Sequence, residues 1–154
     1  MPLNQTTDAW QLFYFKLFKV ALDDLEQDVI DLALQYPQDY KSYPQTQLLA
    51  SVYESITRKI PANPNAEDLQ LSQAPGNAVS NWRRLKQDAP DGYRLFSRFS
   101  SRTVPLIVYA WFNDLNRTRN EKAEGDVYET FKRMLMRGEV PTSIQGLLAE
   151  HESL

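Results

Sequence analysis

The apolar run from Val104 to Phe112 constrains the fold more than any other segment. Its nine residues, Val-Pro-Leu-Ile-Val-Tyr-Ala-Trp-Phe, carry no charge and stand between Arg-Thr and Asn-Asp. A continuous apolar run of this length is typical of a strand buried on both faces. Pro105 has no N–H to donate, so we expect it at the entry of the strand. The chain should therefore fold around a sheet with this strand at its centre.

The N-terminal part predicts one strand and a pair of helices. Residues 10 to 18 are rich in aromatic side chains and partly alternate, which favours a strand. From about residue 19 to 36 the apolar residues follow three-and-four spacing, and Pro37 ends this predicted helix. A second apolar stripe over residues 44 to 60 predicts a second helix. Residues 61 to 81 contain no Lys or Arg and have the composition of a long loop.

The C-terminal part predicts a hairpin and two further helices. Residues 82 to 86 and 92 to 99 are expected as its two antiparallel strands. Capping-box spacing at Asp126 starts a helix that ends at Gly138. Pro141-Thr142 begins a short last helix, and we expect residues 146 to 154 to form a mobile tail.

This order of elements predicts an α+β fold. We expect a small, largely antiparallel sheet of about four strands, with the two N-terminal helices and a C-terminal helix packed on one face. With 154 residues and 42% hydrophobic content, the chain can bury one proper core, so residues 1–154 are predicted to form a single domain.

Composition excludes several classes of function. The chain has no cysteine, which rules out a disulfide framework, thiol catalysis and Cys-based zinc sites. We find no signal-type N-terminus and no run of membrane-spanning length, so a cytoplasmic protein is expected. The net charge of -3 weighs against a nucleic-acid binder, although acids crowd residues 23 to 31 while cations gather elsewhere.

The predicted hairpin concentrates the cations. Residues 82 to 102 contain six Lys or Arg and only two acids. Because alternate residues of a strand face the same side, Arg84 and Lys86 should share one face, as should Arg94 and Arg98. Like charges this close repel one another. The pattern therefore favours an anionic ligand, and phosphate is the leading candidate.

Structural explanations compete with this functional one. Cations on a hairpin commonly protect a sheet edge from aggregation, and Arg94 could pair with Asp88 or Asp91. Tyr128 lies in the apolar stripe of its helix and could be a core residue. Three large aromatic side chains are expected in the core rather than as base-stacking platforms: Trp82, Trp111 and Phe112.

Several motifs carry a resemblance to a known family. Gly92-Tyr93-Arg94-Leu95 followed by Phe99-Ser100 resembles the third-strand signature of the RelE toxin superfamily. The C-terminal motifs are similar to the ending of the YhaV branch of that superfamily: Trp111-Phe112-Asn113-Asp114, Arg119, Tyr128, Phe131 to Leu135, Arg137-Gly138 and Pro141. The stretch from Tyr40 to Ala50 also matches.

The resemblance implies a bacterial endoribonuclease toxin of a type II toxin–antitoxin system that inhibits translation and growth. In such toxins the ribose 2′-hydroxyl attacks the adjacent phosphate, with no metal and no cofactor. By position, the implied catalytic residues are Arg84, Lys86, Arg94, Arg119 and Tyr128. Arg83, Arg98 and Lys132 are the expected substrate-binding cations. The only histidine, His151, lies near the end, so the general base is left open between Lys86, Tyr128 and a carboxylate.

The resemblance also implies partners. The cognate antitoxin is expected to be a PrlF-type protein, and operator DNA is expected to bind through the toxin–antitoxin complex. The substrate is expected to be mRNA, either free or on the ribosome, and no membrane is involved. One departure from the family is the loop 61–81, which lacks the usual basic residues and should weaken nonspecific RNA affinity.

Two other functions stay open. The chain could be a noncatalytic toxin of the same fold that poisons gyrase, although its set of cations disfavours this. It could also be a regulatory component whose basic sheet receives the antitoxin and helps the complex hold DNA.

Overall fold

The computed structural model describes most of the chain. Its described residues are 6–7, 10–66, 69, 82–85, 93–102, 104–113 and 124–151, without the side chains of 6–7, 124–126 and 128. Most of the predicted loop 61–81 and the turn of the predicted hairpin lie outside these ranges.

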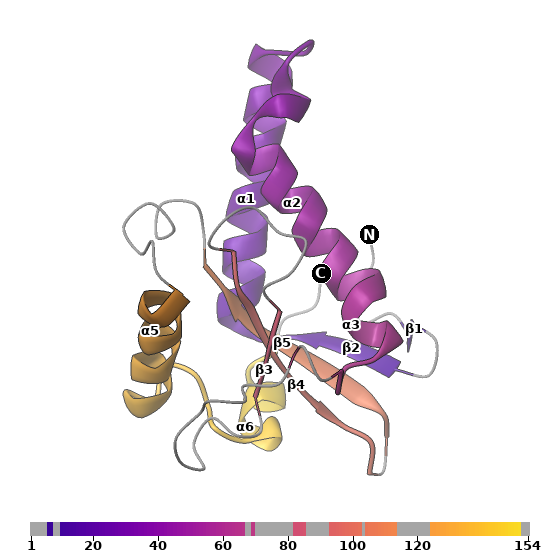
Figure 1. The fold of residues 1–154 in the computed structure, drawn as a ribbon, viewed down its shortest axis with the longest axis vertical. Helices are drawn as coiled ribbons and strands as arrows, with labels where there is room; N and C mark the ends of the chain where they lie inside the picture. The colour runs from indigo at the N-terminus through magenta and orange to yellow at the C-terminus, as the bar shows by residue number, and fades with distance from the viewer. Residues whose placement is uncertain are drawn as a thin grey trace.

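A five-stranded sheet has the order β1-β2-β5-β4-β3 (Figure 1). Its strands are β1 (Thr6–Thr7), β2 (Trp10–Tyr14), β3 (Arg83–Leu85), β4 (Leu95–Ser100) and β5 (Leu106–Phe112). The central position of β5 confirms the prediction from its apolar sequence, and Pro105 directly precedes the strand. Strands β2 and β5 pair in parallel, whereas the other three pairings are antiparallel, so the sheet is mixed but largely antiparallel.

The helices are α1 (Lys16–Gln35), α2 (Pro44–Glu54), α3 (Ile60–Ala62), α5 (Glu124–Met136) and α6 (Ile144–Ala149). A 3₁₀ turn, Tyr40–Ser42, lies between the first two. Figure 1 shows α1 and α2 side by side and extending beyond the sheet, as predicted for a helical pair. Helix α1 begins at Lys16, about three residues earlier than expected. Within the described ranges, every helix is too short or too polar to cross a membrane.

Helices cover both faces of the sheet, which corrects the prediction that they share one face. On what we call the α1 face, Phe18 and Val52 pack in one cluster with Ile107 of β5. On the other side, the α5 face, Phe131 and Leu147 pack in a second cluster with Val108. The physical reason lies in β5, because a strand that is apolar on both sides needs cover on both sides.

A β-bulge decides which aromatic residues of β5 reach the α5 face. Phe96 pairs with Trp111, but the next residue of β4, Ser97, pairs with Tyr109, so Ala110 is an extra residue. Ala110 and Trp111 consequently both belong to the α5-face cluster, and Phe112 returns to the α1 face. Without the bulge, strict alternation would place Trp111 on the α1 face.

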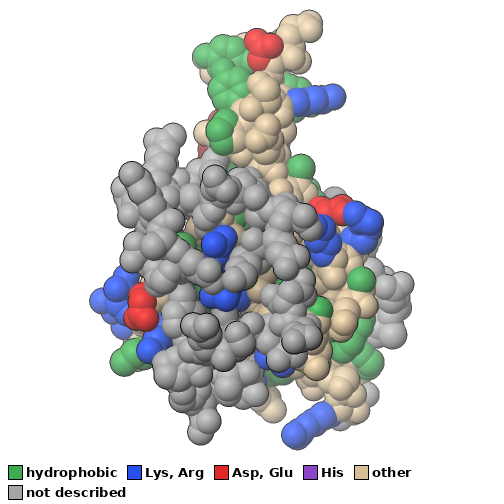
Figure 2. All heavy atoms as spheres, viewed as in Figure 1, with side chains coloured by type: hydrophobic (Ala, Val, Ile, Leu, Met, Phe, Trp, Pro, Cys, Tyr) green, Lys and Arg blue, Asp and Glu red, His purple; other side chains and the backbone are tan. Residues whose placement is uncertain are grey.

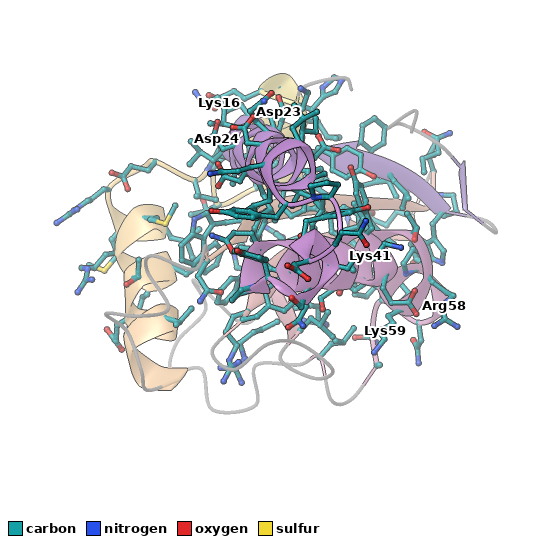
Figure 3. The ribbon with its side chains drawn as sticks, turned by 90° about the horizontal axis from the view of Figure 1, so that it is seen from above. Lys16, Asp23, Asp24, Lys41, Arg58 and Lys59 are labelled. Carbon is teal, nitrogen blue, oxygen red and sulfur yellow. The ribbon has the colours of Figure 1, made fainter. Side chains whose placement is uncertain are left out.

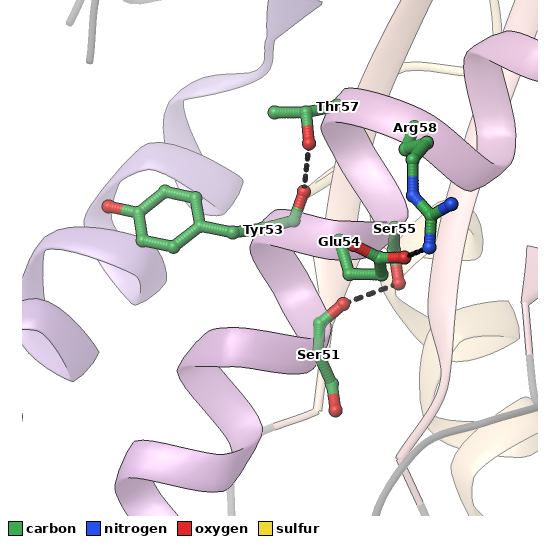
Figure 4. Close-up of polar contacts among 6 residues, drawn as sticks. All are labelled: Ser51, Tyr53, Glu54, Ser55, Thr57 and Arg58. Carbon is green, nitrogen blue, oxygen red and sulfur yellow. Dashed lines mark hydrogen bonds and ion pairs between the residues drawn. The ribbon is translucent and has the colours of Figure 1, made fainter.

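A π-helical turn at Ser55–Lys59 joins α2 to α3 on the α1 face (Figure 4). Ser55 Oγ donates to Ser51 O at 2.6 Å, and Arg58 forms an ion pair with Glu54. Pro61 has no N–H, so it cannot donate to Ile56 O five residues earlier. The buried hydroxyl of Tyr109 donates to that carbonyl instead, at 2.8 Å. This bond ties the helical arm to the central strand.

The C-terminal segment closes the α5 face. Gly138 has a φ of +76° just after α5 ends, as predicted for a helix terminator. The last helix, α6, begins at Ile144, slightly later than Pro141-Thr142 predicted, and its N-cap is Ser143, whose Oγ accepts from Gly146 N at 3.0 Å. The expected tail from residue 146 instead forms most of α6 and packs on the sheet up to His151, while 152–154 lie outside the described residues.

Candidate nucleic-acid interface

Three of the predicted cations lie on the α5 face. The β3–β4 register places Arg84 opposite Phe96, which belongs to the α5-face cluster. Arg98 follows Phe96 by two residues and therefore points to the same side. Arg94 lies between Tyr93 and Leu95, which both pack in the α1-face cluster. Its side chain therefore points to the α5 face, like those of Arg84 and Arg98. All three arginines are half-buried.

The guanidinium group of Arg94 bonds a neighbouring backbone carbonyl, and part of it has no partner among the described residues. Its Nη1 donates to the neighbouring Tyr93 O at 2.7 Å, while its buried Nε has no hydrogen-bond acceptor within the described part of the chain. Among the described residues, no carboxylate forms an ion pair with it. No acid within the described ranges therefore neutralises the positive charge of Arg94.

Arg98 already contacts two other parts of the protein, which distinguishes it from a side chain that is free to bind substrate. Its guanidinium carbon lies 5.5 Å from the centroid of the Trp82 ring, and Nη1 donates to Thr142 O. Burial, and secondarily the positive charge of Arg83, lowers the pKa of Arg98. These contacts connect β4 to the segment before α6, so Arg98 has a structural role whatever else it binds.

Arg83 lies on the other side of the sheet from these three cations. The register places it opposite Ser97, and its guanidinium carbon lies 5.4 Å from the ring centroid of Phe99, which packs on the α1-face cluster. Its Nε and Nη2 donate to Asn65 Oδ1 at 3.2 and 2.8 Å. Burial lowers the pKa of Arg83. The structure therefore does not bring Arg83 together with Arg84 and Arg94.

A stack of aromatic rings fixes α5 beside the three arginines. The ring of Phe131 lies 4.0 Å from that of Phe96, nearly parallel to it, and 4.9 Å from Trp82 in an edge-on arrangement. Trp82 is fully buried and Trp111 is 5% exposed, which confirms both as core residues. Phe112, at 1%, is confirmed as core on the opposite face.

The remaining predicted residues are described only in part. Lys132 is half-buried on α5 and directly follows Phe131. Tyr128 belongs to α5 one turn earlier, but its side chain lies outside the described residues, and so do Lys86 and Arg119. The proposed partners of Arg94, Asp88 and Asp91, also lie outside them.

The acids of residues 23 to 31 lie apart from the three arginines of the α5 face. The acids of residues 23 to 31 sit on α1, which packs against the α1 face, and Figure 3 shows Asp23 and Asp24 on that helix, away from α5. Lys19 pairs with Asp23 at 2.5 Å, so part of this charge is neutralised locally. Figure 2 shows several Lys and Arg side chains and few acidic ones on the side of the molecule that it presents. The acidic helix and the arginines of the α5 face thus have different surroundings.

This arrangement suits a phosphate diester. Planar guanidinium groups can hold two oxygens of one phosphate at once. Arg84 and Arg94 start from diagonal positions across two strands, a separation of about 7–8 Å that one phosphate group and two long side chains can bridge.

Asn113 contacts Arg94 through its side chain, a role that the sequence pattern did not predict. Its Oδ1 accepts from Arg94 N at 2.6 Å. The one feature of the sequence that could have indicated this role is the position of an amide side chain directly after a strand that is buried on both faces.

Comparison with known proteins identifies the family of the chain. Residues 12–152 match a family model, YhaV toxin, described as a toxin with endonuclease activity, of toxin–antitoxin system. Toxin YhaV of Escherichia coli O6:H1 is 31% identical over 153 residues, which cover 99% of this chain and 98% of the relative. A protein with the same identity and coverage is named ribonuclease toxin YhaV in Escherichia coli K12. No solved structure matches the chain significantly.

Proposed function

The chain belongs to the YhaV toxin family, and we propose that it is the endoribonuclease toxin of a toxin–antitoxin system. In this proposal, the ribose 2′-hydroxyl of RNA attacks the adjacent phosphate and leaves a cyclic phosphate and a free 5′-hydroxyl. The observation that carries the proposal is the placement of Arg84 and Arg94 on one face of the sheet, opposite the face that α1 covers.

The chemistry needs little more than positioning and charge. The nucleophile is already tethered to the phosphate that it attacks, so in-line geometry is the first requirement. The pentacoordinate transition state carries more negative charge on its nonbridging oxygens than the ground state. Guanidinium groups mounted on strands are preorganised donors for that charge, and by analogy with oxyanion holes each contributes roughly 10²- to 10³-fold in rate.

Each predicted residue has a proposed role. Arg94 is the leading phosphate clamp because its planar guanidinium can hold two phosphate oxygens, and no carboxylate among the described residues pairs with it. Arg84 supports it from the neighbouring strand, and Lys86 and Arg119 complete the cationic set. Tyr128 is proposed at the reacting atoms. The general base is Lys86, Tyr128 or a carboxylate.

The positions of the three proposed RNA-binding cations support this role to different degrees. Lys132 follows Phe131 on the helix that covers the α5 face, which suits contact with RNA at this site. Arg98 lies on the same face but already bonds Thr142 O. Arg83 bonds Asn65 on the α1 face and would reach RNA only from that side of β3.

The finer features of the proposal follow from the family. We propose that the fold is RelE-like, that residues 1–154 form one domain and that the protein acts in the cytoplasm. The proposed antitoxin is PrlF-type, and the complex binds operator DNA. The proposed substrate is mRNA, on or off the ribosome.

An end-labelled RNA incubated with the purified protein in EDTA tests the proposal. We expect cleavage in the chelator, with products ending in a 2′,3′-cyclic phosphate and a 5′-hydroxyl. Parallel reactions with ribosomes separate free mRNA from ribosome-bound mRNA as the substrate. Intact RNA in both reactions, together with a DNA-damage response in cells that express the chain, would contradict the proposal and favour the gyrase alternative.

A further inference from the structure

Asn113 is a buried polar residue at the end of the central strand. It follows Phe112, the last residue of β5, and its exposed fraction is 0%. A buried amide costs free energy unless its polar atoms are hydrogen-bonded. Its partners therefore indicate why an amide rather than an apolar side chain occupies this position.

Asn113 bonds both main-chain polar groups of Arg94. Its side-chain Oδ1 accepts from Arg94 N at 2.6 Å, and its own N–H donates to Arg94 O at 3.3 Å. Leu95 and Phe112 are the last regular pair of the β4–β5 ladder at this end. Arg94 and Asn113 come next, so the side-chain oxygen extends the ladder by one residue beyond the strands.

The extension matters because Arg94 lies just outside β4, which begins at Leu95. Asn113 fixes the N–H and the C=O on the two sides of the Arg94 Cα. The backbone from which the guanidinium projects is thereby as restrained as that of a strand residue. The bond from Nη1 to Tyr93 O restrains the other end of the side chain.

We propose that Asn113 is a positioning residue that holds Arg94 in the orientation in which its guanidinium meets the scissile phosphate. The inference rests on the proposed function in one respect, namely that Arg94 contacts that phosphate. Asn113 itself touches no substrate. Its effect on the rate passes through Arg94, because misplacement of a catalytic group by about 1 Å can cost on the order of a hundredfold.

A double-mutant cycle on RNA cleavage separates positioning from a purely structural role. In the full chain, Asn113→Ala should lower kcat by about tenfold to a hundredfold and change KM less than about threefold, because Arg94 acts on charge that develops in the transition state. In the Arg94→Ala background, the same substitution should change the residual rate less than about twofold. The backbone bonds exist in both backgrounds, so a purely structural defect would slow both alike and overturn the inference.

One variant serves as a control for this test, and another replaces Asn113→Ala if that variant does not fold. Ser55→Ala removes a different buried polar side chain, on the α1 face, and should leave kcat within about twofold of wild type. If Asn113→Ala does not fold, Asn113→Leu keeps the branched shape and the number of side-chain heavy atoms and removes the acceptor.

Amide hydrogen exchange at Arg94 gives a readout that needs no cleavage. Loss of the acceptor in Asn113→Ala should accelerate exchange of the Arg94 N–H at least about tenfold, whereas Asn113→Asp retains an acceptor oxygen and should preserve protection. Unchanged exchange in Asn113→Ala overturns the inference, whether or not the protein cleaves RNA. A wild-type protein that does not cleave RNA overturns the proposed function alone, and exchange then decides whether Asn113 holds Arg94.

Discussion

The two faces of the sheet use buried polar groups differently. On the α1 face, the hydroxyl of Tyr109 bonds the carbonyl that Pro61 leaves open. On the α5 face, the buried polar groups include the guanidinium groups of Arg94 and Arg98, whose Nε atoms lack a hydrogen-bond acceptor among the described residues. A guanidinium group carries a charge that a phosphate can neutralise, whereas the hydroxyl of Tyr109 is neutral. In the proposed function, the α1 face therefore stabilises the fold and the α5 face is the proposed RNA site.

The largest expected effects come from removing one central ring on each face. Phe131→Ala and Phe18→Ala each remove a fully buried side chain and should lower the free energy of unfolding by about 3–5 kcal/mol. Urea unfolding followed by circular dichroism measures both. At a temperature where both variants stay folded, Phe131→Ala should also impair cleavage because α5 loses its anchor to Phe96. Equal cleavage by the two variants would contradict the division between the faces.

Arg94→Ala should reduce the cleavage rate at least about a hundredfold, because it removes a donor for transition-state charge. Arg94→Lys should recover little of this loss, since an ammonium group lacks the planar fork. Initial rates on end-labelled RNA measure both variants, with thermal unfolding as the check on folding. In cells, growth arrest should be relieved by the alanine substitution. Robust cleavage by Arg94→Ala would remove Arg94 from the mechanism.

Alkaline pH should destabilise the α1 face. Burial raises the pKa of Tyr14, Tyr93 and Tyr109 above the ordinary value of 10. The unfolded chain releases these protons near pH 10 while the folded protein keeps them, so the stability they contribute is full below pH 10 and declines above it. The decline amounts to about 1.4 kcal/mol per pH unit for each such tyrosine.

Urea unfolding at pH 8, 10 and 11 measures this decline. Tyr109→Phe should lower stability at pH 8 by about 1 kcal/mol through the lost bond to Ile56 O, and it should flatten the decline. An unchanged slope in this variant would place the titrating groups elsewhere.

The smallest effect is expected from a cation on the helical arm. Arg58 pairs with Glu54 one helical turn away, and its side chain is 74% exposed. Arg58→Ala should change the free energy of unfolding by less than about 0.5 kcal/mol and leave the cleavage rate unaltered. A loss of cleavage comparable to that of Arg94→Ala would show that RNA also uses the helical side of the molecule.

Sequence patterns predicted the parts of the fold that depend on local periodicity. The apolar run around Val108 identified the central strand, and Gly138 identified the end of α5. The distribution of helices over two faces was missed, although a strand that is apolar on both sides requires cover on both sides. The bulge at Ala110 has no local signal, because an extra residue in a pairing depends on the partner strand.

The candidate site was predictable to a similar extent. Alternation correctly grouped Arg94 with Arg98, and the residue type suggested an anion. The separation of Arg83 from Arg84 follows from adjacency in a strand. The contacts of Arg98 with Trp82 and Thr142, and those of Asn113, depend on long-range packing that spacing does not encode.

A structure of the protein bound to an RNA with a 2′-O-methyl group at the cleavage position tests the central claim most directly, because the blocked nucleophile leaves the substrate intact. The account predicts the scissile phosphate on the α5 face, with an oxygen about 3 Å from the Arg94 guanidinium. A scissile phosphate bound on the α1 face, or on the α5 face beyond the reach of Arg94, would contradict it.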